Sequence, residues 1–211
     1  MIELDRRRLL ALMAAGSALA GTGTFAQESQ SDESIEGELP FAELAMGDEN
    51  APVTMIEYAS LTCPHCASFH NNVLPQLTAD YIDTGKVRLI YREVYFDGPG
   101  LWAALIARCG GPDRYFGLLK LLYERQAEWS RASSQAELVQ GLFSIGRMAG
   151  LTEDEMTVCL QNKDNARAMV ETYQEAMERD GITGTPSFII NGDKVTNQPY
   201  DGLKQEIESR L

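Results

Sequence analysis

The amino-acid sequence predicts an α/β fold in which one small sheet is interrupted by an inserted all-helical domain. Strand patterns occur in two separate places, first at 53–58 with 87–94 and then at 187–196. A helical pattern running from 101 to 179 separates them. Because neither half carries enough strands for a stable sheet of its own, we expect the halves to pair and the helical block to be an insertion.

Composition and charge narrow the class of protein. The chain has 211 residues, of which 44% are hydrophobic, and a formal net charge of −13. This size and composition fit one globular domain, or one domain that carries an insertion. The strong negative charge argues against nucleic acid as a partner.

Residues 1–26 have the pattern of a signal peptide. Three arginines at 6–8 precede a short apolar run at 9–19, and Ala26 is a small residue at the expected cleavage point. The apolar run is shorter than the ~20 residues that span a bilayer. Residues 5–10 also resemble a twin-arginine signal, so both ordinary secretion and twin-arginine export stay open. We therefore expect an exported protein, in which disulfides can persist.

Residues 27–45 form an acidic segment with little to bury. The stretch 27–50 holds eight acidic side chains and no lysine or arginine. Such a composition favours a solvated, mostly disordered tail. We expect the folded chain to begin at about residue 46.

The first half of the sheet domain, 46–98, reads as strand, helix and strand. The strands are expected at 53–58 and 87–94, and Gly98 with its neighbours ends the second. The helix is expected from 64 to about 84, because apolar residues recur at spacings of three and four. These residues are Phe69, Val73, Leu74, Leu77 and Tyr81.

The insertion, 99–180, reads as five helices separated by turn residues. Glycines end several of these segments, and Thr152 with Glu155 forms a capping-box pattern at the start of one. The expected helices cover 101–109, 114–126, 135–149, a segment after 152, and 164–179.

The last part, 181–211, completes the sheet domain. Two short strands at 187–190 and 194–196 flank Asn191 and Gly192, and Asn-Gly is a strong signal for a β-hairpin. A closing helix is expected over 202–211.

The motif Cys63-Pro64-His65-Cys66 lies at the turn from the first strand into the first helix. Two cysteines at this spacing and in this context predict a redox pair. The unpaired N–H groups and the dipole of the helix N-terminus favour a thiolate at Cys63. A protonated His65 adds donors between the two sulfurs.

Other uses of the motif fit the sequence less well. A structural zinc site needs a second pair of ligands, which the sequence does not offer, so no metal and no cofactor are expected. Haem attachment needs a histidine directly after the second cysteine, where Ala67 stands. His70, one helical turn beyond Cys66, is expected to be a helix-surface or packing residue without a functional role.

Taken with Glu57 in the first strand and Gly184-Thr185-Pro186 before the hairpin, the motif resembles that of the DsbA-family thiol–disulfide oxidoreductases. The resemblance covers roughly 46–211 and implies a thioredoxin fold with an inserted helical domain. It also implies that Pro186 is cis, the X-Pro bond being the one where cis is inexpensive. Thr185 and Pro186 are then expected to face the active-site sulfurs and to bind an extended substrate segment.

The resemblance assigns roles to three residues of the predicted active site. Cys63 is the sulfur that a substrate thiolate attacks, and Cys66 is the resolving cysteine. Glu57 is buried near Cys66 and can accept its proton. DsbA carries a lysine near this acid on the next strand, and that position is Tyr91 here, with Arg92 facing the other way.

Cys109 and Cys159 lie on two expected helices of the insertion. They could be free buried thiols or a disulfide, and export favours the disulfide. Some members of the family carry such a second bridge. We expect Cys109–Cys159 to be structural and resistant to reduction.

These observations lead to one functional hypothesis and its rivals. The chain is expected to be a periplasmic, monomeric oxidant that passes disulfides to reduced, unfolded exported proteins, and by resemblance a DsbB-like membrane protein reoxidises it. A disulfide isomerase or reductase of the same superfamily is the main alternative. A chaperone that holds unfolded proteins, with the cysteines secondary, is a further one.

Overall fold

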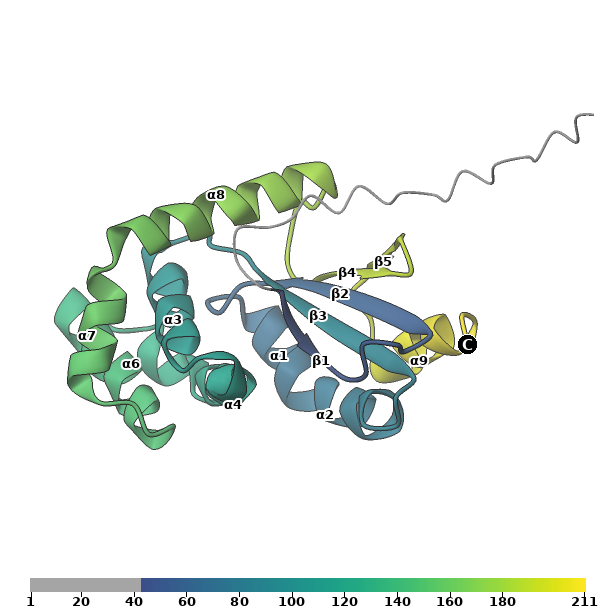
Figure 1. Cartoon of the computed structure of the whole chain (residues 1–211), viewed down its shortest axis with the longest axis horizontal. Helices are drawn as coiled ribbons and strands as arrows, with labels where there is room; N and C mark the ends of the chain where they lie inside the picture. The colour runs from purple at the N-terminus through teal and green to yellow at the C-terminus, as the bar shows by residue number, and fades with distance from the viewer. Residues whose placement is uncertain (1–42) are drawn as a thin grey trace, which may run out of the picture. The chain divides into compact units, whose positions relative to one another are not determined.

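A computed structural model describes residues 43–211, and a single five-stranded sheet lies at its centre (Figure 1). The strand order is β1-β3-β2-β4-β5, with β2 and β3 parallel and every other pair antiparallel. The two halves of the chain meet where β2 pairs with β4, which confirms the predicted α/β fold with an inserted helical block. The strands are β1 (Leu44–Met46), β2 (Val53–Ala59), β3 (Val87–Glu93), β4 (Ser187–Ile190) and β5 (Asp193–Thr196).

The expected signal peptide, 1–26, and residues 27–42 of the expected acidic tail lie outside the described residues. Strand β1 begins at Leu44, within the range expected as tail. It joins the edge of β3, where Leu44 pairs with Tyr91.

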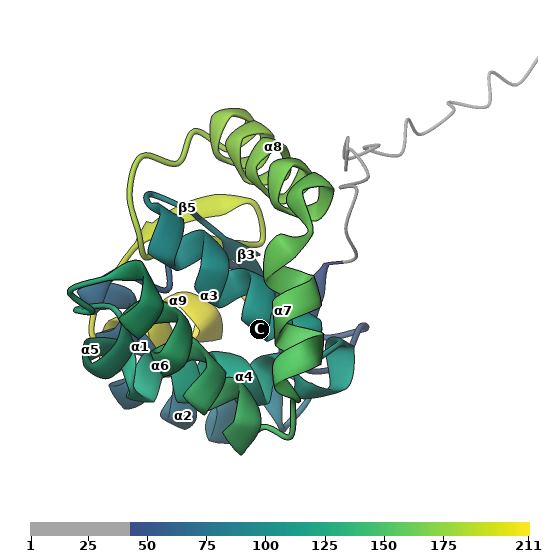
Figure 2. The ribbon, with the colours of Figure 1, turned by 90° about the vertical axis from the view of Figure 1, so that its left-hand side faces the viewer.

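The helices fall into two groups. Figure 1 shows α1, α2 and α9 beside the sheet, and Figure 2 looks onto the insertion, where α3, α4, α6 and α7 pack together. Within residues 43–211, no helix combines the length and apolar character needed to cross a membrane. The helices are α1 (Pro64–Asn72), α2 (Leu74–Leu77), the π-helical turn η1 (Thr78–Ile82), α3 (Gly98–Cys109), α4 (Pro112–Glu124), α5 (Gln126–Trp129), α6 (Gln135–Met148), α7 (Glu153–Gln161), α8 (Lys163–Arg179) and α9 (Tyr200–Glu208).

The single helix expected over 64–84 is broken into α1, α2 and η1. Pro75 lies at this break, has no N–H to give to the preceding turn, and its ring crowds the carbonyl four residues back. The helical ladder resumes with wider spacing, as the N–H of Asp83 binds the carbonyl of Thr78 at 2.8 Å.

Both faces of the sheet are buried, and the alternating direction of side chains along β2 decides which side chain points to which face. Val53 and Met55 pack with residues of α1 and α9, whereas Tyr58 packs with Ala176 of α8. Glu57 has the same parity as Val53 and Met55, so it points toward α1. The strand pattern therefore carries an acidic side chain into the layer that holds the cysteines.

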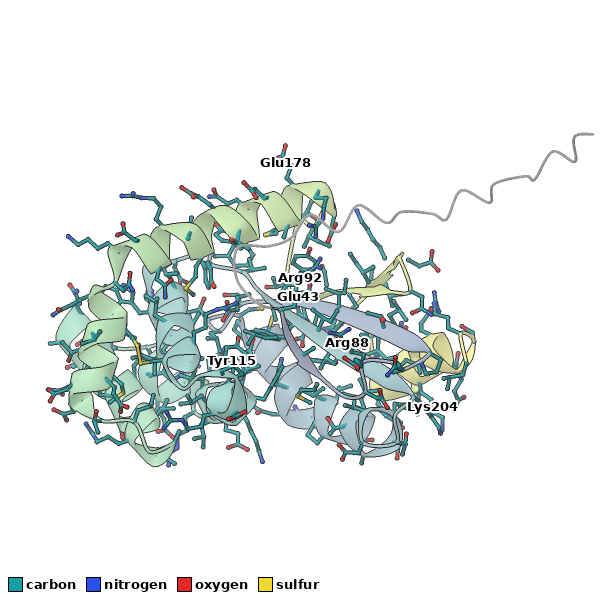
Figure 3. All side chains as sticks on the ribbon, viewed as in Figure 1. Glu43, Arg88, Arg92, Tyr115, Glu178 and Lys204 are labelled. Atoms are coloured by element: carbon teal, nitrogen blue, oxygen red, sulfur yellow. A yellow bond between two sulfur atoms is a disulfide. The ribbon has the colours of Figure 1, made fainter. Side chains whose placement is uncertain are left out.

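On the α8 face, Arg92 ties three segments together. It pairs with Glu43 at 2.7 Å and with Asp180 at 2.8 Å, and Figure 3 shows Glu43 and Arg92 side by side. Tyr58 donates to the carbonyl of Ala176 at 3.2 Å on the same face. Arg92 thus points away from the cysteine face of the sheet, as expected from the sequence.

The side chains of the insertion share one hydrophobic core cluster with residues of β2, β3 and α1, and a covalent link joins α3 to α7. Cys109 and Cys159 form a disulfide with a Cα–Cα distance of 5.9 Å. Thr152 and Glu155 make both hydrogen bonds of the capping box at the start of α7. Cys66 also belongs to this core cluster, which places the C-x-x-C motif at the junction of the sheet and the insertion.

Candidate active site

Cys63 is the residue that caps the N-terminus of α1, and Pro64 is the first residue inside the helix. Proline suits this position because its fixed φ is helical and the missing N–H would have no partner there. The N–H of Cys63 binds the carbonyl of Ser60 at 3.0 Å and closes the turn that follows β2. Cys63 is half-buried, whereas Cys66, one turn into the helix, is fully buried.

The two thiols have opposite acidities. The pKa of Cys63 is lowered to about 5, first by the hydrogen bond from the Cys66 thiol and further by the Thr185 side chain and the backbone N–H groups of Cys66 and His65. Partial burial opposes this shift. The pKa of Cys66 is raised by the same hydrogen bond, by its burial and by the negative charge of Glu57. At neutral pH the site therefore holds an accessible thiolate and a buried thiol.

His65 is exposed on the first turn of α1. In the structure, the backbone N–H of His65 lowers the pKa of Cys63 by helping to stabilise its thiolate. The helix N-terminus thus acts on the sulfur as its position in the sequence predicts.

The loop before β4 lies against the first cysteine. The Thr185–Pro186 peptide bond is cis, as the resemblance implies. In its thiol form, Cys63 donates to the carbonyl of Thr185 at an Sγ–O distance of 3.4 Å. Residues 63 and 185, far apart in the sequence, are therefore brought together at one surface of the sheet domain.

The active-site turn is also held by the insertion, through a residue that sequence reasoning missed. Gln126, at the start of α5, is buried, and its Nε2 donates to the carbonyl of Leu61 at 2.7 Å and to that of Cys63 at 2.9 Å. The hydroxyl of Thr62 donates to Asp97, the N-cap of α3, at 2.9 Å. Nothing local in the sequence marks Gln126, because its partners lie more than sixty residues away.

Glu57 is fully buried beside a residue that was expected to have no role. Its two carboxylate oxygens each lie 3.1 Å from Nε2 of His70. Of the two positions expected for His70, the surface one is wrong and the packed one is confirmed, because its side chain is only 4% exposed; its pairing with the acid was not expected. The signal that could have found it is its spacing, since a residue four places after Cys66 shares its face of the helix.

Aromatic rings complete the surroundings of Glu57. Tyr91 lies opposite Glu57 on β3, and its hydroxyl is 2.7 Å from that of Tyr123 on α4. The His70 ring stacks on Tyr123 with a centroid distance of 4.1 Å. Burial raises the pKa of Tyr91 and of Tyr123, so both remain neutral phenols.

This arrangement suits thiol–disulfide exchange. A partly exposed, low-pKa sulfur can be attacked and can leave, and a second sulfur one helical turn away can close the disulfide. Among residues 43–211, no group of three histidine, cysteine or acidic side chains is placed to hold a metal ion.

Comparison with known proteins agrees with the fold and with the class of site. The family model described as Thioredoxin matches residues 41–209. A protein of Rickettsia conorii named as a protein-disulfide oxidoreductase is 31% identical over 170 residues, which cover 80% of this chain and 60% of that protein. Disulfide bond formation protein D of Bacillus subtilis is 28% identical, covering 79% of this chain and 76% of that protein.

A solved structure gives the same picture. The crystal structure of Wolbachia pipientis alpha-DsbA1 superposes with a TM-score of 0.73 at 32% identity, covering 81% of this chain and 92% of that one. The chain spans 60 to 64% of the length of the Rickettsia relatives that it matches.

Proposed function

The chain belongs to the thioredoxin-fold, DsbA-like protein-disulfide oxidoreductases, and we propose that it oxidises pairs of thiols in other proteins through Cys63 and Cys66. The observation that carries the proposal is the contrast between the two sulfurs. The pKa of Cys63 is lowered to about 5, whereas that of Cys66 is raised. A low-pKa thiol leaves readily from a mixed disulfide and stabilises the reduced form, which makes the oxidised form a strong oxidant.

The exchange proceeds in two displacements. In the first, a substrate thiolate attacks Cys63 Sγ of the Cys63–Cys66 disulfide, so a mixed disulfide forms and Cys66 is released. In the second, the other substrate thiolate attacks the substrate sulfur of the mixed disulfide, and Cys63 leaves as a thiolate. The substrate gains a disulfide, and the enzyme is left with two reduced cysteines.

The loop at Thr185 and Pro186 supports a protein substrate rather than a small thiol alone. It lies beside Cys63 ahead of β4, and an extended segment placed there would carry its cysteine to the exposed sulfur. We propose that reduced, unfolded exported proteins are the substrates.

The location and the reoxidant are further parts of the proposal. The charged and apolar pattern of residues 1–26 supports export to the periplasm, with cleavage near Ala26. A DsbB-like membrane protein would restore the disulfide, and the oxidase would act as a monomer. Cell fractionation, together with trapping of the in-cell redox state of Cys63 in the presence and absence of such a membrane protein, tests these points.

Oxidation of reduced, unfolded ribonuclease tests the activity. The wild-type protein should restore ribonuclease activity, and Cys63→Ser should abolish this. The reduction potential of Cys63–Cys66 measured against glutathione should be more oxidising than the about −270 mV of thioredoxin. A potential near that of thioredoxin, or strong reshuffling of scrambled ribonuclease with weak oxidation of the reduced form, would replace the oxidase proposal with an isomerase or reductase. Protection of unfolded protein that survives Cys63→Ser, with no oxidation by the wild type, would favour a holding chaperone.

A further inference from the structure

A buried pair of ionisable side chains lies directly behind the active site. Glu57 of β2 is 0% exposed, and His70 of α1 has a side chain that is 4% exposed. The Nε2 atom of His70 lies 3.1 Å from each carboxylate oxygen. We call these two residues the buried pair.

The hydrogen of the buried pair can be placed by chemistry. An ionised carboxylate only accepts hydrogen bonds, so the contact requires a hydrogen on Nε2 of His70. Both the imidazolium and the neutral Nε2–H tautomer meet this requirement. His70 can therefore hold the carboxylate in one orientation whether the pair carries one proton or two.

The groups that face the buried pair come from four elements. Cys66 lies on α1, one helical turn before His70, and the charge of Glu57 acts on its thiol. Tyr91 of β3 lies beside Glu57 in the sheet and Tyr123 of α4 stacks on the imidazole, and burial keeps both phenols neutral. From β4 the neighbour is Phe188, which is apolar. Cys66 is thus the facing group that gains and loses a proton during exchange.

Because Cys66 is buried, a proton is needed to neutralise its sulfur when the disulfide breaks. When the Cys63–Cys66 disulfide is broken, the departing Cys66 carries a negative charge into a site without access to water, where a charge is costly. The buried pair lies beside this sulfur and can supply the proton locally.

We propose that His70 is a positioning residue for the exchange reaction, which fixes the Glu57 carboxylate and shares with it the proton that Cys66 takes up and returns. The inference rests on the proposed function, because it concerns a step of that reaction.

A substrate thiolate forms a bond to Cys63 Sγ, the Cys63–Cys66 bond breaks, and its electron pair goes to Cys66 Sγ. One proton moves from the buried pair to that sulfur, so the pair is left with one proton fewer and Cys66 becomes a neutral thiol. On reoxidation, Cys66 returns the proton as its sulfur again forms the disulfide.

Single-turnover reduction of the oxidised protein by dithiothreitol tests the proposal, with acid quenching and alkylation at each pH. His70→Gln keeps a hydrogen-bond donor for Glu57 but cannot exchange the proton. It should lower the rate constant by roughly 10²-fold, the low end of what a placed proton-transfer group contributes. It should also remove one limb, meaning one pH-dependent slope, from the profile of this rate constant against pH.

Two further variants separate this effect from a general disturbance of the site. Glu57→Gln should remove the same limb, and the double variant should lose little more than either single one, since the two residues act as a unit. Asn72→Gln is the control, as it changes an exposed polar side chain of α1 two residues beyond His70, and should keep the limb. A profile for His70→Gln that matches the wild type would overturn the proposal.

A measurement on the wild-type protein covers the case in which the variants do not fold. The chain has two histidines, so imidazole NMR signals are few, and the signal that contacts the ring protons of Tyr123 belongs to His70. Its ring ¹⁵N signals should differ between the oxidised and reduced protein at the same pH, and identical signals in both states would overturn the proposal. Dithiothreitol and NMR report on Cys63–Cys66 without a protein substrate, so failure of ribonuclease oxidation alone would refute the proposed function and not this step.

Discussion

Replacing Cys66 with alanine or with serine separates two causes of the low pKa of Cys63. The largest contribution to that pKa, which lies at about 5, is the hydrogen bond from the Cys66 thiol. Cys66→Ala removes the donor, whereas Cys66→Ser replaces it with a hydroxyl that can donate to the same sulfur. The backbone donors at the start of α1 are kept in both variants.

The size of the effect follows from the energy of such a bond. A hydrogen bond to a charged group contributes about 1.5–3 kcal/mol, and one pKa unit corresponds to about 1.36 kcal/mol. The loss of the donor should therefore raise the pKa by about 1–2 units. Because Cys63 is half-buried and partly screened by water, we expect the lower part of this range, a pKa of about 6 in Cys66→Ala. In Cys66→Ser the pKa should stay near its wild-type value.

Thiolate absorbance at 240 nm, measured against pH, gives the result directly. Cys109 and Cys159 are bonded to each other and do not contribute, so Cys63 is the remaining thiol in both variants. Cys63→Ala, which leaves the buried high-pKa thiol, is the baseline and should show no thiolate signal below about pH 8.5. Equal pKa values for Cys66→Ala and Cys66→Ser would refute the reasoning and would assign the low pKa to Thr185 and the backbone N–H groups of the helix N-terminus.

Three other perturbations have defined outcomes. The pKa of Cys63 is lower in the folded protein than in the unfolded chain, so the thiolate stabilises the folded, reduced protein. This contribution should be complete above about pH 8.5 and should be lost as pH falls through about 5. Urea denaturation of the wild type and of Cys63→Ala at several pH values measures it. Replacing Cys109 and Cys159 together with alanine opens a loop of 50 residues and should cost about 4 kcal/mol in the chain-entropy estimate, or roughly 8–16 °C in thermal midpoint by calorimetry; a change below about 1 kcal/mol would contradict this. Gln126→Leu leaves two buried carbonyls of the active-site turn without their donor and should cost about 1–3 kcal/mol in urea denaturation, and an unchanged midpoint would show that water replaces the amide.

The parts of the site that the sequence predicts are those that depend on local pattern. The position of Cys63 at a helix N-terminus follows from a strand, a turn and Pro64 in succession. The inward direction of Glu57 follows from strand alternation, and the same alternation, read across β3, turns Tyr91 toward the acid and Arg92 away from it. Each of these conclusions needs only the period of one element and the pairing of two strands.

The parts that the sequence does not reveal depend on contacts between distant segments. The position of Gln126 against the active-site turn is set by how the insertion packs, and no pattern around residue 126 encodes it. His70 is an intermediate case, because its helical spacing from Cys66 is readable but the burial of that helix face is supplied by Tyr123 of α4. The break in the first helix was readable too, since Pro75 has no N–H for the helical ladder, yet the apolar period alone favours a continuous helix.

The helical insertion therefore does more than enlarge the domain. The buried sulfur, Cys66, packs in the core cluster of the insertion, and its carboxylate neighbour is covered through a histidine that rests on Tyr123. The half-buried sulfur, Cys63, instead faces the loop at Thr185, in the sheet domain. Two cysteines on one helical turn thus lie in two environments, one made by the insertion and one by the sheet. Since the pKa of each sulfur affects how readily it leaves and how stable the reduced form is, a change in how α4 packs on α1 should alter the redox chemistry even when no residue touching sulfur is changed.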